Sequence, residues 1–217
     1  HEIKNPLTPI QLTLDRLKNK YSNQLKDNES NNFKDNLKII NNQIKQIEKL
    51  VNEFSDFARM PKPIFQKNNL INLLEENIKL IQELDNSINI NLSNNKKVIL
   101  LNCDKEQLSR VFFNLIKNSI ESIQEKVKKS NNTNNKITIE LNDYDDHIDL
   151  IIVDTGLGFE NLKSNIKDIL NPYFTTKKNG SGLGLSIVNK IVNDHNGKIE
   201  FIPINIGAKI KITFLKI

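Results

Sequence analysis

The 217-residue sequence is poor in several residue types, and each scarcity excludes a class of protein. Its one cysteine, Cys103, excludes an intrachain disulfide framework and fits a reducing compartment, and we expect an inert thiol at a strand end. Aromatic residues make up 6% of the chain, which gives no support for nucleic-acid stacking. The longest apolar runs, such as residues 98–101, are far shorter than the roughly 20 residues that span a bilayer, and no signal peptide is recognisable.

The remaining composition is that of a soluble globular protein, with 37% apolar residues, 26% charged residues and a net charge of +5. Because the lysines are scattered, we interpret the positive charge as a solvated surface and expect no nucleic-acid partner. The sequence begins with His1, and its single methionine is Met60. We therefore expect a fragment, with any sensor or membrane anchor upstream of it.

Apolar residues recur at alternating steps of four and three in two series near the N-terminus. The members are Ile3, Leu7, Ile10, Leu14, Leu17 and Tyr21, then Phe33, Leu37, Ile40, Ile44, Ile47, Val51 and Phe54. This spacing predicts two antiparallel helices joined by a polar turn at residues 22–32. Two such helices leave an apolar stripe uncovered, so we expect a homodimer built around a four-helix bundle.

Prolines mark both ends of this helical region. Pro6 and Pro9 predict a kink or a helix start near the beginning, and Pro61 and Pro63 end the second helix. We place the domain boundary near residue 62, which gives domains of residues 1–62 and 63–217.

The second domain alternates between helical and strand-like patterns. Helices are predicted at residues 70–84, from a capping box of Asp104 and Gln107 onward, and at 183–194, where Asn196-Gly197 ends the last helix. Strands are predicted at residues 88–92, 97–101, 136–141, 147–153, 198–202 and 208–214. We expect a mixed α/β layer with helices on one sheet face, and an α+β fold class for the whole chain.

Glycine is also scarce, and five of the seven glycines lie within residues 154–188. They form two clusters that read DTGLGF and GSGLGL, with glycines Gly156, Gly158, Gly180, Gly182 and Gly184. Glycine permits positive φ and close approach, and glycines before a helix start expose N–H groups that bind phosphate. The window predicts a nucleotide site, although neither GxxxxGK[ST] nor a GxGxxG opening a βαβ unit is present.

Three side chains beside these glycines can recognise a nucleotide. Asp154 ends an apolar strand, and its carboxylate can accept a hydrogen bond from the amine of adenine, although a simple Asp-Gly turn also explains the residue. Asn114 and Asn118 lie four apart on one helix face among apolar neighbours. Their amide oxygens suit Mg²⁺, although asparagine is abundant throughout this sequence.

The segment NPYFTTKKNGSG joins the two clusters. Lys177 and Lys178 can place a cation beside a phosphate, and Tyr173 and Phe174 can anchor the segment by packing. A mobile polar loop with a chance lysine remains the alternative.

The first helix is headed by His1-Glu2, with Asn5 four residues beyond the histidine. An imidazole can act as a nucleophile toward a phosphoryl group, and a neighbouring carboxylate can accept its proton. A lone helix histidine is usually unreactive. His147 and His195 are interpreted as turn or helix-end residues, and no histidine or cysteine cluster suggests a metal site.

Together and in this order, the motifs resemble those of two-component sensor histidine kinases, most closely the nitrogen-regulation, NtrY-like type. HEIKNP resembles the phosphoacceptor box, FFNLIKNSIES the N box, DTGLGF the G1 box, NPYFTTK the F box and GSGLGLSIV the G2 box. The resemblance covers essentially the whole chain. It implies autophosphorylation on histidine by ATP, followed by phosphotransfer to the receiver domain of a response regulator.

The resemblance implies a role for each matching residue. His1 would accept the γ-phosphoryl group, Glu2 would act as base, and Asn5 would orient the water that hydrolyses the phosphorylated regulator. Asp154 would bind the adenine amine, and Asn118 would ligate Mg²⁺ with support from Asn114. The residues implied around the ATP lid and phosphates are Gly156, Gly158, Phe174, Lys177, Gly180, Gly182, Leu183 and Gly184.

The implied architecture is a helical dimerisation and phosphotransfer hairpin (DHp-like), followed by the GHKL (Bergerat) α/β sandwich shared with the gyrase, Hsp90 and MutL ATPases. The fragment would be cytoplasmic, within a protein anchored in the inner membrane. Two alternatives stay open at this point. One is an inactive remnant that binds only ATP or a receiver domain, and the other is a GHKL ATPase of another purpose.

Overall fold

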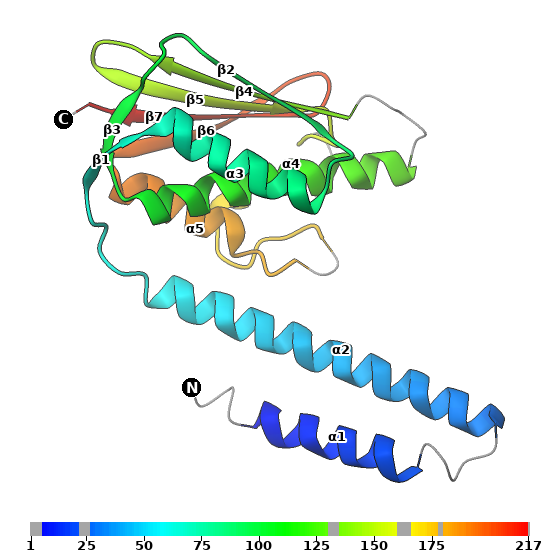
Figure 1. The fold of residues 1–217 in the computed structure, drawn as a ribbon. Helices are drawn as coiled ribbons and strands as arrows, with labels where there is room; N and C mark the ends of the chain where they lie inside the picture. The colour runs from blue at the N-terminus through cyan, green and yellow to red at the C-terminus, as the bar shows by residue number, and fades with distance from the viewer. Residues whose placement is uncertain (1–5, 22–26, 130–134, 160–165, 178–179, 217) are drawn as a thin grey trace. The chain divides into compact units, whose positions relative to one another are not determined.

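The computed structural model describes residues 6–21, 27–129, 135–159, 166–177 and 180–216 (Figure 1). The chain divides into two compact units. The first contains the two N-terminal helices, and the segment Thr176–Ser181 groups with it. The second comprises Pro61–Thr175 and Gly182–Ile217.

The first unit contains α1 (Leu7–Tyr21) and α2 (Asp27–Ala58). Helix α1 begins directly after Pro6, which is the second of the two predicted outcomes. Pro9 lies in the first turn, where a missing N–H costs no intrahelical hydrogen bond. The predicted turn was wrong for residues 27–32, which are helical, because asparagine, aspartate and serine favour helix N-termini as well as turns.

The two predicted apolar series face each other only in part. Leu7, Leu37 and Ile44 are buried, and the rings of Tyr21 and Phe33 pack edge to face with centroids 6.3 Å apart. Other members of the series are between 37% and 45% exposed in the single chain. They are Ile10, Leu17, Ile40, Ile47 and Phe54. Five of the twelve described members of the two series are therefore left uncovered.

The second unit is built on a five-stranded sheet of order β2-β4-β5-β7-β6. The strands are β2 (Asn89–Asn94), β4 (Lys136–Asp143), β5 (His147–Asp154), β6 (Gly197–Pro203) and β7 (Ala208–Leu215). The β2–β4 pair is parallel and the other pairs are antiparallel. The sequence pattern predicted the antiparallel pairing of the last two strands, and the parallel β2–β4 pair was not predicted.

A separate two-stranded sheet pairs β1 (Gln66–Asn69) with β3 (Leu100–Cys103). The strand predicted at residues 97–101 is thus shifted toward the C-terminus and lies outside the main sheet. Strand β1 was not predicted, because its sequence QKNN has neither apolar alternation nor strand-forming residues.

Helices α3 (Leu70–Leu84), α4 (Lys105–Lys129) and α5 (Gly184–Asp194) cover one face of the five-stranded sheet, as predicted (Figure 1). A short 3₁₀ helix, η1 (Ile166–Leu170), precedes α5. Alternate residues of β5 and β7, such as Leu150 and Ile212, are buried under the helices. No helix among the described residues has the length and apolar character needed to cross a membrane.

The start of α4 is capped, but only half of the predicted capping box forms. The Gln107 N–H donates to Asp104 Oδ1 over 2.9 Å, as predicted. The Gln107 side chain, however, donates to the Pro61 carbonyl at 3.0 Å instead of reaching back to Asp104. Because the Ile64 N–H also donates to Asp104 Oδ2 at 2.8 Å, the segment after Pro61 is tied to the start of α4.

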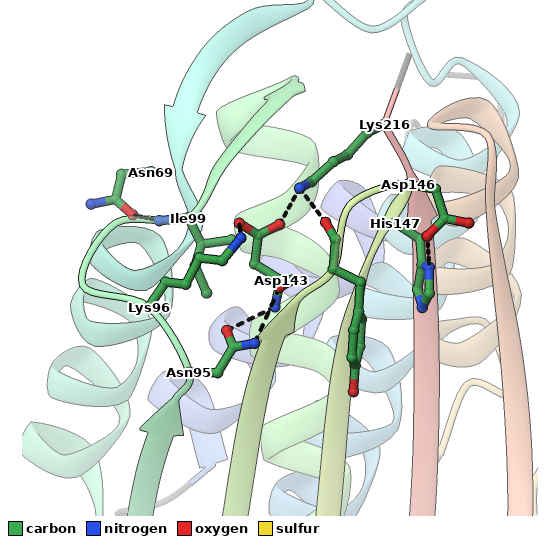
Figure 2. A network of polar contacts seen from close by, with 9 residues as sticks. Asn69, Asn95, Lys96, Ile99, Asp143, Asp146, His147 and Lys216 are labelled. Carbon is green, nitrogen blue, oxygen red and sulfur yellow. Dashed lines mark hydrogen bonds and ion pairs between the residues drawn. The ribbon is translucent and has the colours of Figure 1, made fainter.

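A polar network links the end of β4 to the connection between β2 and β3 and to the segment after β7 (Figure 2). Lys96 Nζ lies 2.8 Å from the Asp143 carboxylate, and Lys216 forms a second ion pair with it. Asn95 accepts the Asp143 N–H at 2.9 Å and donates to its carbonyl at 3.1 Å. Asp143 therefore fixes both the β2–β3 connection and the end of the last strand.

Candidate functional site

Asp154 lies at the end of β5 and is only 4% exposed. Its Oδ1 accepts the Gly156 N–H at 2.9 Å and the Ala208 N–H at 3.3 Å. Burial raises the pKa of this carboxyl, while hydrogen bonds from Gly156, Ser119 and Ala208 and the charge of Lys126 act in the opposite direction. A carboxylate can accept about four hydrogen bonds, so these three donors leave acceptor capacity for a ligand amine.

The glycines after Asp154 permit very close packing. A Cβ on Gly158, which has φ +69°, would lie 2.4 Å from the Gly207 carbonyl oxygen. A Cβ on Gly207 would lie 1.8 Å from the backbone carbonyl oxygen of Asp154. Gly156 lies against α4, where a Cβ would be 2.3 Å from Ser122 Oγ. Sequence reasoning missed Gly207. Because glycine is scarce outside residues 154–188, this isolated glycine was a usable signal.

Asn114 and Asn118 are half-buried on α4. The Asn114 Nδ2 donates to the Arg110 carbonyl at 2.9 Å. Its Oδ1 faces the first residue of α5, because a Cβ built on Gly184 would lie 3.5 Å from it. An amide oxygen beside a helix N-terminus fits a hard cation whose other ligands are phosphate oxygens.

A backbone hydrogen bond joins the residues on either side of segment 174–181. The Tyr173 N–H donates to the Gly182 carbonyl at 3.1 Å, and both residues have positive φ, 69° and 71°. Phe174 is half-buried, and its N–H donates to the Asn171 carbonyl at 3.2 Å. Leu183, 1% exposed, anchors the start of α5.

Several predicted residues cannot be placed in this site. His1, Glu2, Asn5 and Lys178 lie outside the described residues. Lys177 and Gly180 belong to the segment Thr176–Ser181, which groups with the helical unit. The roles of these residues therefore stay predictions.

Sequence reasoning missed three α4 side chains that act on Asp154 or on the loop after it. Ser122 Oγ accepts the Leu157 N–H at 3.0 Å, and Lys126 Nζ donates to the Thr155 carbonyl at 2.7 Å. The buried Ser119 acts to lower the pKa of the Asp154 carboxyl. The spacing of three and four places these side chains on one helix face. The available sequence signal was the pair Ser119 and Ser122, three residues apart among the apolar residues of α4.

A pocket of about 200 Å³ borders the same loop. Its lining residues are Lys126, Gly156, Leu157, Ile204, Asn205, Ile206 and Gly207.

Two family models match this chain in the order that the motifs predict. Residues 1–63 match the His Kinase A (phospho-acceptor) domain, and residues 103–216 match the histidine kinase-, DNA gyrase B-, and HSP90-like ATPase domain. The chain belongs to the two-component sensor histidine kinases. This confirms the family predicted from the five sequence boxes.

Curated relatives place this histidine kinase in the NtrY-like branch. It is 36% identical over 200 residues to the putative sensor histidine kinase NtrY-like of Rickettsia felis, a match that covers 92% of this chain and 32% of that protein. It is 34% identical over 216 residues to the nitrogen regulation protein NtrY of Azorhizobium caulinodans, covering 98% of this chain and 27% of that protein. The chain thus spans about a third of the length of these relatives.

Solved histidine kinases have the same fold. The kinase ThkA in complex with the response regulator TrrA matches with a TM-score of 0.68 and 26% identity, covering 100% of this chain and 59% of that chain. The isolated catalytic domain of ThkA matches with a TM-score of 0.60 and 29% identity, covering 70% of this chain and 96% of that chain. The predicted α+β class, a helical hairpin followed by a GHKL-type sandwich, is confirmed.

Proposed function

We propose that the chain is the kinase core of an NtrY-like sensor. It binds ATP in the α/β unit, accepts the γ-phosphoryl group on His1 and passes it to the receiver domain of a response regulator. The order of the two matched domains and the likeness to a kinase crystallised with its regulator support this proposal. The boundary between phosphotransfer and catalytic domains is placed near residue 62, and the core would work in the cytoplasm of an inner-membrane sensor.

The observation that carries the proposal is that α4 contacts both halves of a nucleotide site. Asn114 faces Gly184 at the start of α5, and about two turns further along the helix Ser122 Oγ accepts the Leu157 N–H of the loop after Asp154. A base bound at Asp154 would therefore direct its phosphates toward the N-terminus of α5. Asp154 would accept the adenine amine, with Gly156 and Gly158 giving the backbone room to approach the base.

The phosphate side would be formed by Asn114, Asn118 and the second glycine cluster. Asn118 would hold Mg²⁺ with support from Asn114, and a bound Mg²⁺ neutralises charge that develops on the phosphates. Gly182, Leu183 and Gly184 would present the α5 N-terminus. Lys177 and Gly180 would close over the phosphates, and Phe174 would anchor that segment.

The transfer step would use His1, Glu2 and Asn5, which precede α1 in the sequence. A nitrogen of the His1 imidazole forms a bond to the γ-phosphorus while the bond from that phosphorus to the ADP oxygen breaks, and Glu2 accepts the imidazole proton. Asn5 would orient the water that later hydrolyses the phosphorylated regulator. The helical hairpin would pair with a second copy through its exposed apolar residues.

The test is phosphorylation with γ-labelled ATP and Mg²⁺, using a longer version of the protein that extends upstream of His1. We expect label that is stable in alkali and lost in acid, as phosphohistidine requires. His1→Gln should abolish the label, and His147→Gln, which changes a histidine on the sheet, should retain it.

Each other outcome contradicts a defined part of the proposal. Acid-stable label, or label that survives His1→Gln, would exclude His1 as acceptor. ATP binding without label in any version would indicate an inactive remnant. Steady ATP hydrolysis that is independent of His1 would indicate an ATPase of another purpose.

A further inference from the structure

The loop after Asp154 is hydrogen-bonded to α4 at two separate points. Lys126 Nζ donates to the Thr155 carbonyl over 2.7 Å, and Ser122 Oγ accepts the Leu157 N–H over 3.0 Å. The two α4 residues are four apart and form a stripe along one helix face. Each bonds to a different part of the loop, so together they fix its position and its orientation.

The loop is also confined on its other side. Gly207 lies so close to the Asp154 carbonyl that a Cβ would come within 1.8 Å of the oxygen, and Ala208 donates to the carboxylate at 3.3 Å. On the α4 side, a Cβ on Gly156 would come within 2.3 Å of Ser122 Oγ. The backbone of the loop is thus closely packed between α4 and the start of β7 at these glycines.

The same stripe continues the face that carries the predicted metal ligand. Asn118 and Ser122 are four residues apart, so they lie one above the other on α4. Any movement of the loop relative to α4 would therefore change the distance between the base site and the phosphate site.

We propose that Ser122 and Lys126 are positioning residues that hold the loop after Asp154 on α4, and that they set the preference of the site for the amino group of adenine. This inference rests on the proposed ATP site. A carboxylate accepts a hydrogen bond from the 6-amino group of adenine and repels the 6-oxo group of hypoxanthine. That discrimination requires the carboxylate to stay at a fixed place relative to the base.

The test compares ADP with IDP by isothermal titration calorimetry in the presence of Mg²⁺. These two nucleotides share their sugar and phosphates and differ at the base. Wild-type protein should bind ADP at least about tenfold more tightly than IDP. In Lys126→Met and Ser122→Ala, we expect this ratio to fall about fivefold, with IDP affinity changed less than about twofold.

Two further variants separate positioning from general effects. Lys126→Arg keeps the charge and the donor, and should restore most of the ADP preference. Lys129→Met removes a lysine of the same helix that pairs with Glu125 at 2.7 Å on the exposed surface, and should leave the ratio unchanged. Binding of IDP shows in each case that the variant is folded.

The outcomes distinguish this inference from the proposed function. An unchanged ratio in both Lys126→Met and Ser122→Ala, or an equal loss of ADP and IDP affinity, overturns the positioning role while ATP binding stands. A wild-type protein that binds ADP and IDP equally overturns the base contact of Asp154 and this inference with it. A wild-type protein that binds neither nucleotide overturns the proposed function as well.

Discussion

The backbone N–H of Asp104 donates to Nε2 of His195 over 3.0 Å, across a separation of 91 residues. The other ring nitrogen, Nδ1, lies 2.8 Å from the Ile191 carbonyl, so the imidazole carries its proton on Nδ1. The ring also packs against Phe65 with centroids 5.1 Å apart. One buried histidine therefore joins the start of α4, the end of α5 and the segment that leads into β1.

We expect His195→Ala to lower the free energy of unfolding by about 2–4 kcal/mol. The change removes one buried acceptor and one donor and leaves a cavity beside Phe65. Urea unfolding followed by circular dichroism measures the effect. His147→Ala is the control, because that ring is partly exposed and its loss should cost less than about 1 kcal/mol. Equal losses in the two variants would contradict the joining role of His195.

This cluster shows what sequence patterns can and cannot predict. The cap of α4 at Asp104 depends on residues three apart, so the local pattern was sufficient. The capping box predicted that the Gln107 side chain accepts the Asp104 N–H. His195 accepts it instead, and no local pattern around Asp104 or His195 indicates that these two residues meet. The same limit applies to Asp154, whose own motif was recognisable while its contact with Ala208 depends on strand pairing.

Asp154→Asn should abolish measurable ADP binding without destabilising the fold at neutral pH. Because burial raises the pKa of the Asp154 carboxyl, its ionised form is costly in the folded state. This cost to stability begins as the pH rises through the ordinary carboxyl range. It reaches its full value once the pH exceeds the raised pKa of the folded state. Asparagine carries no such cost, so we expect thermal unfolding at pH 7.5 to show equal or higher stability than wild type.

The advantage of Asp154→Asn should vanish near pH 3, below the ordinary carboxyl range, because the wild-type carboxyl is then protonated in both the folded and the unfolded state. Melting curves at pH 7.5 and pH 3 give the comparison. A variant that is less stable than wild type at pH 7.5 and equal at pH 3 would reverse the predicted sign and show that ionised Asp154 is stabilising.

Asp143→Asn should destabilise the protein at neutral pH by about 1–2 kcal/mol. Burial acts to raise the pKa of Asp143, but hydrogen bonds and attraction from Lys216 and Lys96 outweigh it and hold the pKa below its ordinary value (Figure 2). The stabilisation is therefore present above the ordinary carboxyl range and is lost as pH falls through the lowered folded pKa.

Urea titrations at pH 7 and at pH 3 test the Asp143 network. The difference between wild type and Asp143→Asn should shrink at pH 3. Asp145→Asn changes an exposed carboxylate in the adjacent turn and should have little effect at either pH. A loss in Asp143→Asn that does not depend on pH would mean that packing, and not charge, explains the network.

Cys103 should be unreactive in the folded protein. Its thiol is buried in β3, and burial raises its pKa to about 11, so almost no thiolate exists at pH 8. We expect no reaction with a disulfide reagent at pH 8 until urea unfolds the chain, when one thiol should titrate. Ser93→Cys adds an exposed thiol as a control for reagent access. Native Cys103 that reacts as fast as the added cysteine would contradict this burial.

The uncovered apolar stripe of the hairpin should be a dimer interface. Ile47 is 42% exposed in the single chain, although it belongs to the same series as the buried Ile44. Pairing with a second copy would remove this stripe from water, and a carboxylate inside such an interface is costly to bury. We expect Ile47→Asp to raise the dimer dissociation constant at least about tenfold, because both copies carry the change.

Sedimentation equilibrium over a range of concentrations measures this constant for the 217-residue chain. Asn42→Asp is the matched control, since it introduces the same carboxylate at an exposed position of α2 outside the apolar series. It should leave the constant within about twofold of wild type. Because the stripe lies on the hairpin and the nucleotide contacts lie on α4, Ile47→Asp should also bind ADP as wild type does. A wild-type chain that is monomeric would contradict the predicted dimer. Equal weakening by both variants would place the dimer contact outside the apolar stripe.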